Sequence, residues 1–184
     1  MWGVDMRNLL LEKVDYEIEE TPRGVWRRFV YPNGAYFAEF RSNLEMFGLP
    51  FIHYTRGICP ETGRHIVAKG VIGIGRIATG IIALGQASAG VIALGQASIG
   101  LLFCVAQGGA GLYALGQLVL GWIFGAGQIS AGTTAIGQVA AGRYVLAQVG
   151  FGTYLWTPRH ADPIAVGHFH EIWNWISSFL PHSG

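Results

Sequence analysis

Glycine recurs at intervals of ten or eleven residues through the middle of the chain, and this spacing constrains the fold more than any other feature. The marker glycines are Gly70, Gly80, Gly90, Gly100, Gly111, Gly121, Gly132, Gly142 and Gly152. A glutamine keeps the same phase and lengthens its spacing in the same two units, at Gln86, Gln96, Gln107, Gln117, Gln128, Gln138 and Gln148. Because two residue types shift together, we interpret the segment as a tandem repeat of about eight ten-residue units.

Each unit has glycine at its first position and usually at its sixth, where glycine suits a backbone corner. The runs between these corners alternate as short strands do. One unit therefore predicts one rung of a parallel β-solenoid, with rungs stacked at roughly 4.8 Å. A four-sided coil of twenty residues fits the spacing nearly as well. The eleven-residue units predict a bulge just before the glutamine, near Val105 and Ala126.

The alternation also predicts which side chains face the interior. In the unit that begins at Gly90, the inward set is Ile92, Leu94, Ala97 and Ile99, and the outward set is Val91, Ala93, Gln96 and Ser98. One outer face then carries an apolar patch that is larger than soluble monomers usually expose. Its members are Leu101, Phe103, Leu112, Trp122 and Phe124. The patch predicts a contact with a protein partner, a second copy or a membrane, unless the bulges reverse the pattern locally.

The second outer face is expected to display the glutamine ladder with Ser88, Ser98 and Ser130. Stacked amides can hydrogen-bond along the axis, which favours a structural role for the ladder. An ice-binding face is the sharper alternative, but it would need a regular array, commonly of threonine. The threonines at 133, 134 and 153 form no such array.

Membrane-spanning helices are the rival interpretation of the repeat. The chain is 51% hydrophobic, 12% charged and carries a net charge of +1, with no charged residue between Arg76 and Arg143. Glycines ten residues apart, however, share no face of a helix. Frequent glycine is also costly in a helix, and a glutamine in every unit is costly in lipid. These features favour the solenoid.

The flanking segments are expected to cap the solenoid, which would otherwise expose unpaired strand edges. Residues 1–69 predict a short helix from Met6 to Lys13, a strand near Ile18, a hairpin around Pro32-Asn33-Gly34 and a strand over residues 49–54. The repeat domain is placed at residues 70–157. Residues 158–184 predict a helix that begins at Asp162-Pro163. Its expected packing face contains Ala165, Phe169, Ile172, Trp173, Ile176, Phe179 and Leu180, with Pro181 ending the helix.

The chain offers few groups for chemistry. Cys59 and Cys104 have no metal-knuckle or redox spacing. His168 and His170 point about 200° apart on a helix and cannot chelate one metal together. We recognise no catalytic motif, and the repeat has almost no acids or bases. The sequence therefore predicts a non-enzyme with no cofactor and no metal, and an uncharacterised enzyme with its site in residues 1–69 is a further alternative. Arginines that interleave with aromatic residues near Trp26 are expected to be solvated rather than to bind nucleic acid.

Some local motifs are similar to those of known repeat proteins. The motifs are Phe47-Gly48-Leu49-Pro50-Phe51-Ile52-His53, Pro60-Glu61-Thr62-Gly63-Arg64, Ala68-Lys69-Gly70 and the Gly-x-Ile-Ala-Leu-Gly units. Over about residues 44–180 the chain resembles a group of uncharacterised bacterial Gly-rich repeat proteins, which implies a β-solenoid and no catalytic residues. The pentad rhythm is distantly similar to pentapeptide-repeat proteins, some of which mimic DNA with acidic faces. The absence of carboxylates from this repeat argues against such mimicry.

Together these features predict an interaction protein that self-associates or docks a protein partner through its apolar solenoid face. The alternative is a membrane-associated protein, either peripheral through the apolar face and an exposed Trp175, or integral. The N-terminus has no apolar run of signal-peptide length, so a cytoplasmic location is expected.

Overall fold

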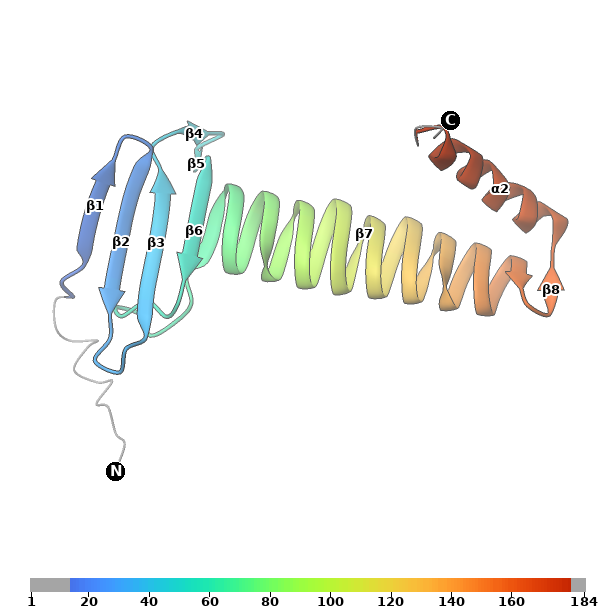
Figure 1. Ribbon diagram of the computed structural model, residues 1–184, viewed down its shortest axis with the longest axis horizontal. Helices are drawn as coiled ribbons and strands as arrows, with labels where there is room; N and C mark the ends of the chain where they lie inside the picture. The colour runs from blue at the N-terminus through green and yellow to red at the C-terminus, as the bar shows by residue number, and fades with distance from the viewer. Residues whose placement is uncertain (1–13, 180–184) are drawn as a thin grey trace, which may run out of the picture. The chain divides into compact units, whose positions relative to one another are not determined.

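The computed structural model describes residues 14–179, and most of them lie in β-strands. The first strands are β1 (Glu17–Thr21), β2 (Gly24–Val30) and β3 (Tyr36–Ser42), with the short β4 (Glu45–Met46) and β5 (Leu49–Pro50) before β6 (Ile52–Arg56). Strands β1, β2, β3 and β6 pair antiparallel in that order (Figure 1). The expected hairpin at Gly34 is confirmed. The helix expected from Met6 to Lys13, and Leu180 and Pro181, lie outside the described residues.

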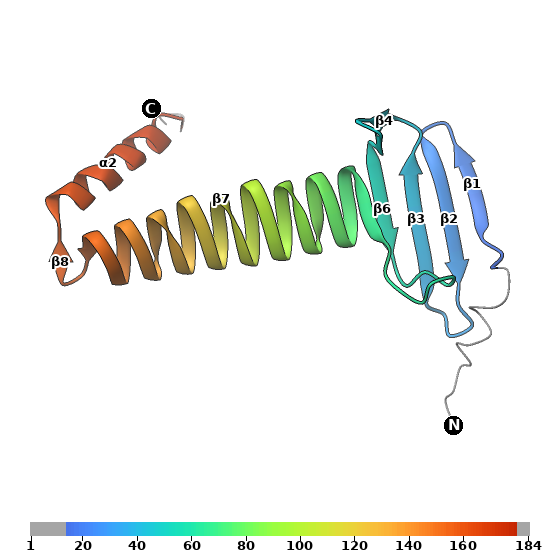
Figure 2. The same ribbon diagram turned by 180° about the vertical axis from the view of Figure 1, so that it is seen from behind.

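The repeat follows as β7 (Val67–Thr157) and winds in successive turns (Figures 1 and 2). Its first turn pairs in parallel with β6, with Ile52 opposite Ile72 and Tyr54 opposite Ile74. The chain divides into two compact units, and the boundary falls inside β7 between Ser98 and Ile99. The first unit therefore contains the N-terminal sheet together with the first turns of β7.

Contacts within β7 recur one repeat apart in both units. In the first unit the hydroxyls of Ser88 and Ser98 lie 2.7 Å apart. In the second unit the Phe103 and Tyr113 rings stack with centroids 5.3 Å apart, as do those of Tyr144 and Tyr154. The glycine corners stack in the same way, because a Cβ atom on Gly111 would lie 2.6 Å from the carbonyl oxygen of Gly100.

Small side chains fill the interior of β7, which corrects the predicted inside and outside. Ala93 is fully buried and Ser98 nearly so, although both were expected to face outward. Ile99 was expected inside and is 67% exposed. The other buried positions of the two inner lines are Ala68, Ala78, Ala83, Ser88, Cys104, Ala114, Val119, Ser130, Ala135, Ala140 and Val145. Because alanine, serine and other small residues hold most of these inner positions, most large side chains of the repeat lie at half-buried or exposed positions.

The extra residue of each eleven-residue unit lies earlier than predicted. A Cβ atom on Gly100 would collide with the carbonyl oxygen of Phe103, and one on Gly121 would collide with that of Phe124. In the neighbouring repeats, a Cβ atom on the marker glycine would instead meet the carbonyl oxygen of the marker glycine one repeat earlier. The insertion is thus taken up directly after the marker glycine, and the expected bulges at Val105 and Ala126 are wrong. The register of the repeat is restored at the next buried position, which is Cys104 in the eleven-residue repeat that begins at Gly100.

The second unit ends with β8 (His160–Ala161), which pairs antiparallel with the end of β7, and α2 (Pro163–Ser177). The predicted helix start at Asp162-Pro163 is confirmed, since the Asp162 carboxylate accepts a hydrogen bond from the Ile164 N–H at 2.8 Å. His168 fastens α2 to β7. Its ring stacks on Tyr144 at 4.0 Å, and its Nε2 atom lies 2.9 Å from the Thr134 hydroxyl.

The predicted packing face of α2 is only partly correct. Ala165 and Phe169 are buried, whereas Trp173, Ile176 and Phe179 are exposed. The second half of the helix therefore leaves its apolar residues uncovered. Among residues 14–179, no helix has both the length and the apolar character needed to cross a membrane.

The glycine corners give a direct test of the stacking. A Cβ atom on Gly137 would lie 2.5 Å from the carbonyl oxygen of Gly127, whereas one on Gly108 would meet no atom within 4 Å. We expect Gly137→Ala to lower the free energy of unfolding by about 1–3 kcal/mol through overpacking. Gly108→Ala should stay within about 0.5 kcal/mol of the wild type. Urea denaturation followed by circular dichroism measures both, and equal stability of the two variants would contradict the stacking.

Candidate functional site

An apolar groove runs along one glycine corner of the second unit. Four successive turns line it with the residues that flank each marker glycine, namely residues 99–101, 110–112, 120–122 and 131–133. We call this the apolar groove. Its volume is about 800 Å³. The marker glycines form the floor because they lack side chains, and the residues on either side of each glycine form the walls.

Three of the residues predicted for the interface line this groove together. Trp122 is 80% exposed, Leu101 is 70% exposed and Leu112 is half-buried. The opposite wall contains Ile99 and Leu120, which are also exposed and which the sequence analysis missed. Both residues lie just before a marker glycine, and the predicted alternation placed this position in the interior.

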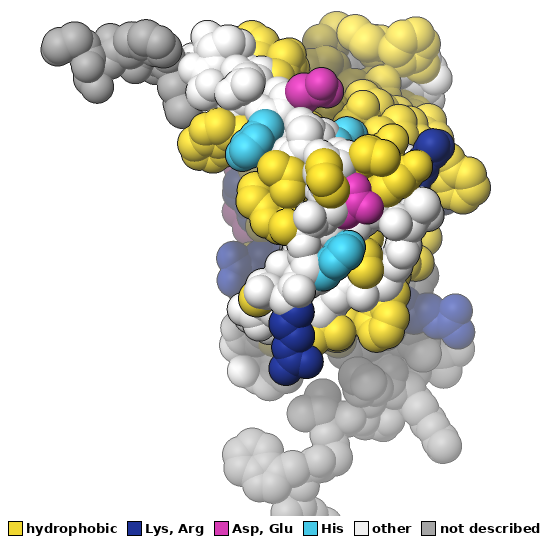
Figure 3. Space-filling view, turned by 90° about the vertical axis from the view of Figure 1, so that its right-hand side faces the viewer, with side chains coloured by type: hydrophobic (Ala, Val, Ile, Leu, Met, Phe, Trp, Pro, Cys, Tyr) yellow, Lys and Arg dark blue, Asp and Glu magenta, His cyan; other side chains and the backbone are white. Residues whose placement is uncertain are grey.

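The remaining predicted interface residues lie elsewhere. Phe103 stacks on Tyr113, and Phe124 is half-buried outside the groove lining. Trp175 lies on α2, where it is 65% exposed and contacts the ring of Phe179 edge-on with centroids 5.0 Å apart. Figure 3 faces the end of the second unit that carries β8 and α2, and hydrophobic side chains cover much of that end.

A second groove follows the other glycine corner of the same unit. Its volume is about 780 Å³, and its lining is Gly116, Gly127, Gln128, Ile136, Gly137, Gln138, Leu146, Ala147, Gln148, Trp156, Thr157 and Pro158. We call this the glutamine groove. Three members of the glutamine ladder thus lie in register beside a row of apolar side chains.

All seven ladder glutamines are exposed, as predicted. The serines expected beside them at 88, 98 and 130 are buried in the interior instead. Ser130 donates a hydrogen bond to the Ile136 carbonyl at 2.9 Å. Within residues 14–179 no hydrogen bond involves a ladder glutamine side chain. Each amide therefore keeps its donors and its acceptor available to solvent or to a ligand.

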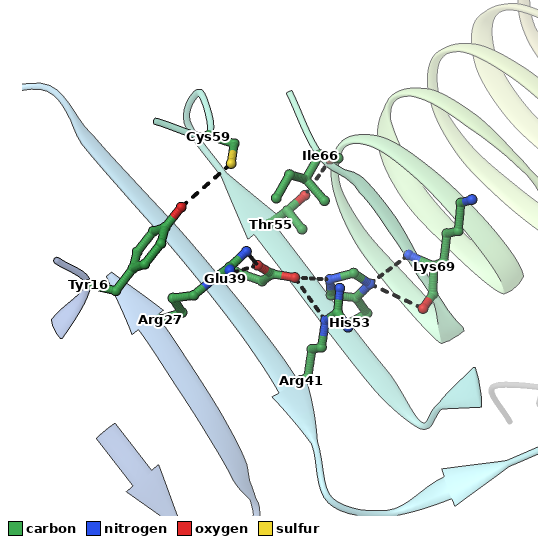
Figure 4. Close-up of polar contacts among 9 residues, drawn as sticks. All are labelled: Tyr16, Arg27, Glu39, Arg41, His53, Thr55, Cys59, Ile66 and Lys69. Atoms are coloured by element: carbon green, nitrogen blue, oxygen red, sulfur yellow. Dashed lines mark hydrogen bonds and ion pairs between the residues drawn. The ribbon is translucent and has the colours of Figure 1, made fainter. Parts of the chain in front are cut away.

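A buried polar cluster lies in the first unit, and nothing in the sequence pattern had singled it out. Glu39 on β3 is only 3% exposed and accepts hydrogen bonds from three side chains (Figure 4). Arg27 donates to Oε2 from Nη2 at 2.6 Å, Arg41 donates to Oε1 from Nε at 2.9 Å, and His53 Nε2 lies 3.0 Å from Oε1. These contacts join β2, β3 and β6 through one carboxylate.

His53 connects Glu39 to the start of β7. Its Nδ1 atom lies 2.8 Å from the backbone nitrogen of Lys69 and 3.1 Å from the Lys69 carbonyl oxygen, and its Nε2 atom lies 3.0 Å from Glu39 Oε1. Both ring nitrogens are then occupied by structural partners. These contacts therefore link the start of β7 to the sheet.

Tyr16 and Cys59 form a second, partly buried contact in this unit, with the hydroxyl 3.7 Å from the sulfur. Burial and the hydrogen bond with Cys59 raise the pKa of Tyr16 well above its usual range. A raised pKa makes the phenol a poor general base near neutral pH. Within residues 14–179, no group of three or more His, Cys, Asp or Glu side chains is placed to hold a metal ion.

The chain was compared with protein-family models, curated proteins and solved structures, and none of them matches it.

Glu39 gives the first unit a specific pH dependence. Burial opposes its ionisation, but the hydrogen bonds from His53 and Arg27 and the charges of Arg27 and Arg41 outweigh burial and lower its pKa from 4.5 to about 2. A lowered pKa stabilises the fold above pH 4.5, and that stability is lost as the pH falls toward 2. The shift corresponds to ~3 kcal/mol at pH 7.

We therefore expect Glu39→Gln to lower the free energy of unfolding by about 3 kcal/mol at pH 7 and by roughly half as much at pH 3. Urea denaturation at the two pH values measures the difference from wild type. Glu45→Gln is the matched control, because Glu45 is exposed, and it should have little effect at either pH. A deficit in Glu39→Gln that does not shrink at low pH would contradict the assigned ion cluster.

Proposed function

We propose that β7 is a narrow β-solenoid in which each ten-residue unit makes one complete coil. The contacts one repeat apart support this choice over a twenty-residue coil, because the corner glycines, the Ser88–Ser98 pair and the stacked aromatic pairs all join neighbouring units. We further propose that the N-terminal sheet caps the first coil and that β8 with α2 caps the last. Such a fold is also what the resemblance to Gly-rich repeat proteins implies.

On this scaffold we propose that the protein is a non-catalytic interaction module that self-associates through the apolar groove. The observation that carries the proposal is the groove itself, a glycine floor between two walls of exposed Ile, Leu and Trp side chains. Exposed apolar patches of this kind mark interaction sites. A glycine floor also lets a partner approach the backbone closely.

A second copy of the chain is the occupant that fits the groove best. No charged residue occurs between Arg76 and Arg143, so the groove has no charge with which to select a polar partner and none to repel its own copy. Homodimer interfaces are the most apolar class of protein interface. In a two-fold dimer, the Leu101 and Trp122 side chains of one copy would pack against the marker glycines of the other copy's groove.

Trp122→Arg tests the self-association. The substitution would place a charge at the most exposed wall residue, and we expect the dimer to dissociate at concentrations where the wild type stays dimeric, with affinity lowered more than tenfold. Multi-angle light scattering after size exclusion measures the mass directly. Circular dichroism of the variant checks that the fold is retained.

Ile129→Arg is the matched control. Ile129 is 52% exposed in the same unit but does not line the apolar groove, so this variant should remain dimeric. A monomeric wild type whose elution profile does not change in Trp122→Arg would reject the proposal.

Membrane association is the second candidate function, and one observation favours it. Trp175 near the end of α2 and Phe179 just beyond it are exposed, and their rings contact each other edge-on. Tryptophan prefers the membrane–water interface. From Pro163 to Phe179 the sequence has no Lys or Arg, so attachment would depend on insertion of these rings into neutral lipid rather than on attraction to anionic lipid.

Flotation with phosphatidylcholine vesicles tests this candidate. We expect wild-type protein to float with the vesicles at both low and high salt, and Trp175→Glu to remain in the soluble fraction, because an acidic side chain is costly to bury in the interface. Trp122→Arg is the control that separates the two surfaces, since it should still float. Failure of the wild type to float would reject the membrane role and leave self-association standing.

A further inference from the structure

The glutamine groove contains hydrogen-bonding side chains that have no part in the proposed self-association. It lies along the sixth-position glycine corner of the second unit, whereas the apolar groove follows the marker glycines. We propose that the glutamine groove binds an extended, neutral glycan, with one sugar residue opposite each coil. This inference holds whether or not the chain forms dimers, because the two grooves have no lining residue in common.

Uncharged hydrogen-bonding groups are the first reason for a neutral ligand. The polar side chains that line the groove are Gln128, Gln138, Gln148 and Thr157, and none of them is ionisable. A primary amide offers two donors and an acceptor, and a hydroxyl group can pair with either. Since the glutamine amides make no hydrogen bond within residues 14–179, a ligand would displace only water.

The spacing of the amides is the second reason. Gln128, Gln138 and Gln148 are one repeat apart, so they follow the stacking distance of neighbouring strands, about 4.8 Å. A pyranose residue in an extended glycan advances by a similar length, and each sugar can therefore present its hydroxyls to one amide in turn. An extended peptide advances by about 3.3 Å per residue, so its polar groups would fall out of register with the ladder.

The apolar wall is the third reason. Ile136, Leu146 and Trp156 line the groove beside the amides. The Trp156 ring is held in place by two rings on α2. Its centroid lies 6.3 Å from that of Phe169 and 5.6 Å from that of His170. A fixed aromatic ring suits the C–H face of a sugar, while the amides take its hydroxyls. The groove volume of about 780 Å³ lies within the range of small-ligand sites.

Titration calorimetry with neutral oligosaccharides tests the inference. The probes are β-1,4-glucan, β-1,4-xylan, β-1,3-glucan and β-1,4-mannan oligomers of two to six residues, added to the full chain. We expect at least one series to bind, with affinity that rises with length until three or more sugars lie along the groove. Gln138→Leu should weaken that binding at least tenfold, because it leaves sugar hydroxyls without a partner at the central coil.

Gln96→Leu is the matched control and should bind as the wild type does, because Gln96 holds the same repeat position but does not line the groove. Trp156→Ala should also weaken binding, and circular dichroism checks that each variant keeps its fold. The inference is overturned if no neutral oligosaccharide binds, or if Gln138→Leu binds as tightly as Gln96→Leu. Binding of an extended neutral peptide in place of all the glycans would overturn it as well.

Discussion

The narrow interior of β7 is the constraint on which the rest of the structure depends. Each repeat has two inner positions, and residues as small as Ala83 and Ser88 fill them. The marker glycines between these positions lie so close to the preceding turn that a Cβ atom would meet its carbonyl oxygen. A core this thin holds few large side chains, so the Ile, Leu, Phe and Trp residues of the repeat lie at the corners and on the surface.

Both grooves follow from that displacement of large residues. Side chains next to a glycine corner rise on either side of a backbone that carries none, and the same arrangement repeats in each turn. The apolar groove and the glutamine groove are thus two products of one geometry, and they differ only in the residues that the repeat places beside each corner. Their chemistry can change by substitution at exposed positions without disturbing the buried lines of small residues.

The sequence predicted the periodic features well and the non-periodic ones poorly. The glycine and glutamine spacing gave the repeat, and Asp162-Pro163 gave the start of α2. The inner face was predicted the wrong way round, because alternation alone does not state which of two apolar sets lies inside. In this interior the smaller residue is the buried one, as Ala93 and Ile99 show. The Glu39–His53 contact joins β3 to β6, and no local pattern announces a pairing between residues that far apart.

The parallel pairing of β6 with the first turn of β7 has a consequence for how the chain is made. Residues 52–54 precede their partners at 72–74 by only twenty positions, and each later turn meets the one made ten or eleven residues before it. Contacts of such short sequence separation form rapidly. During synthesis from the N-terminus, the sheet would be complete before the repeat emerges and would present an edge on which the first turn can pair. Each turn would then be the template for the next, so the repeat can fold at the pace of translation without a long wait for a distant partner.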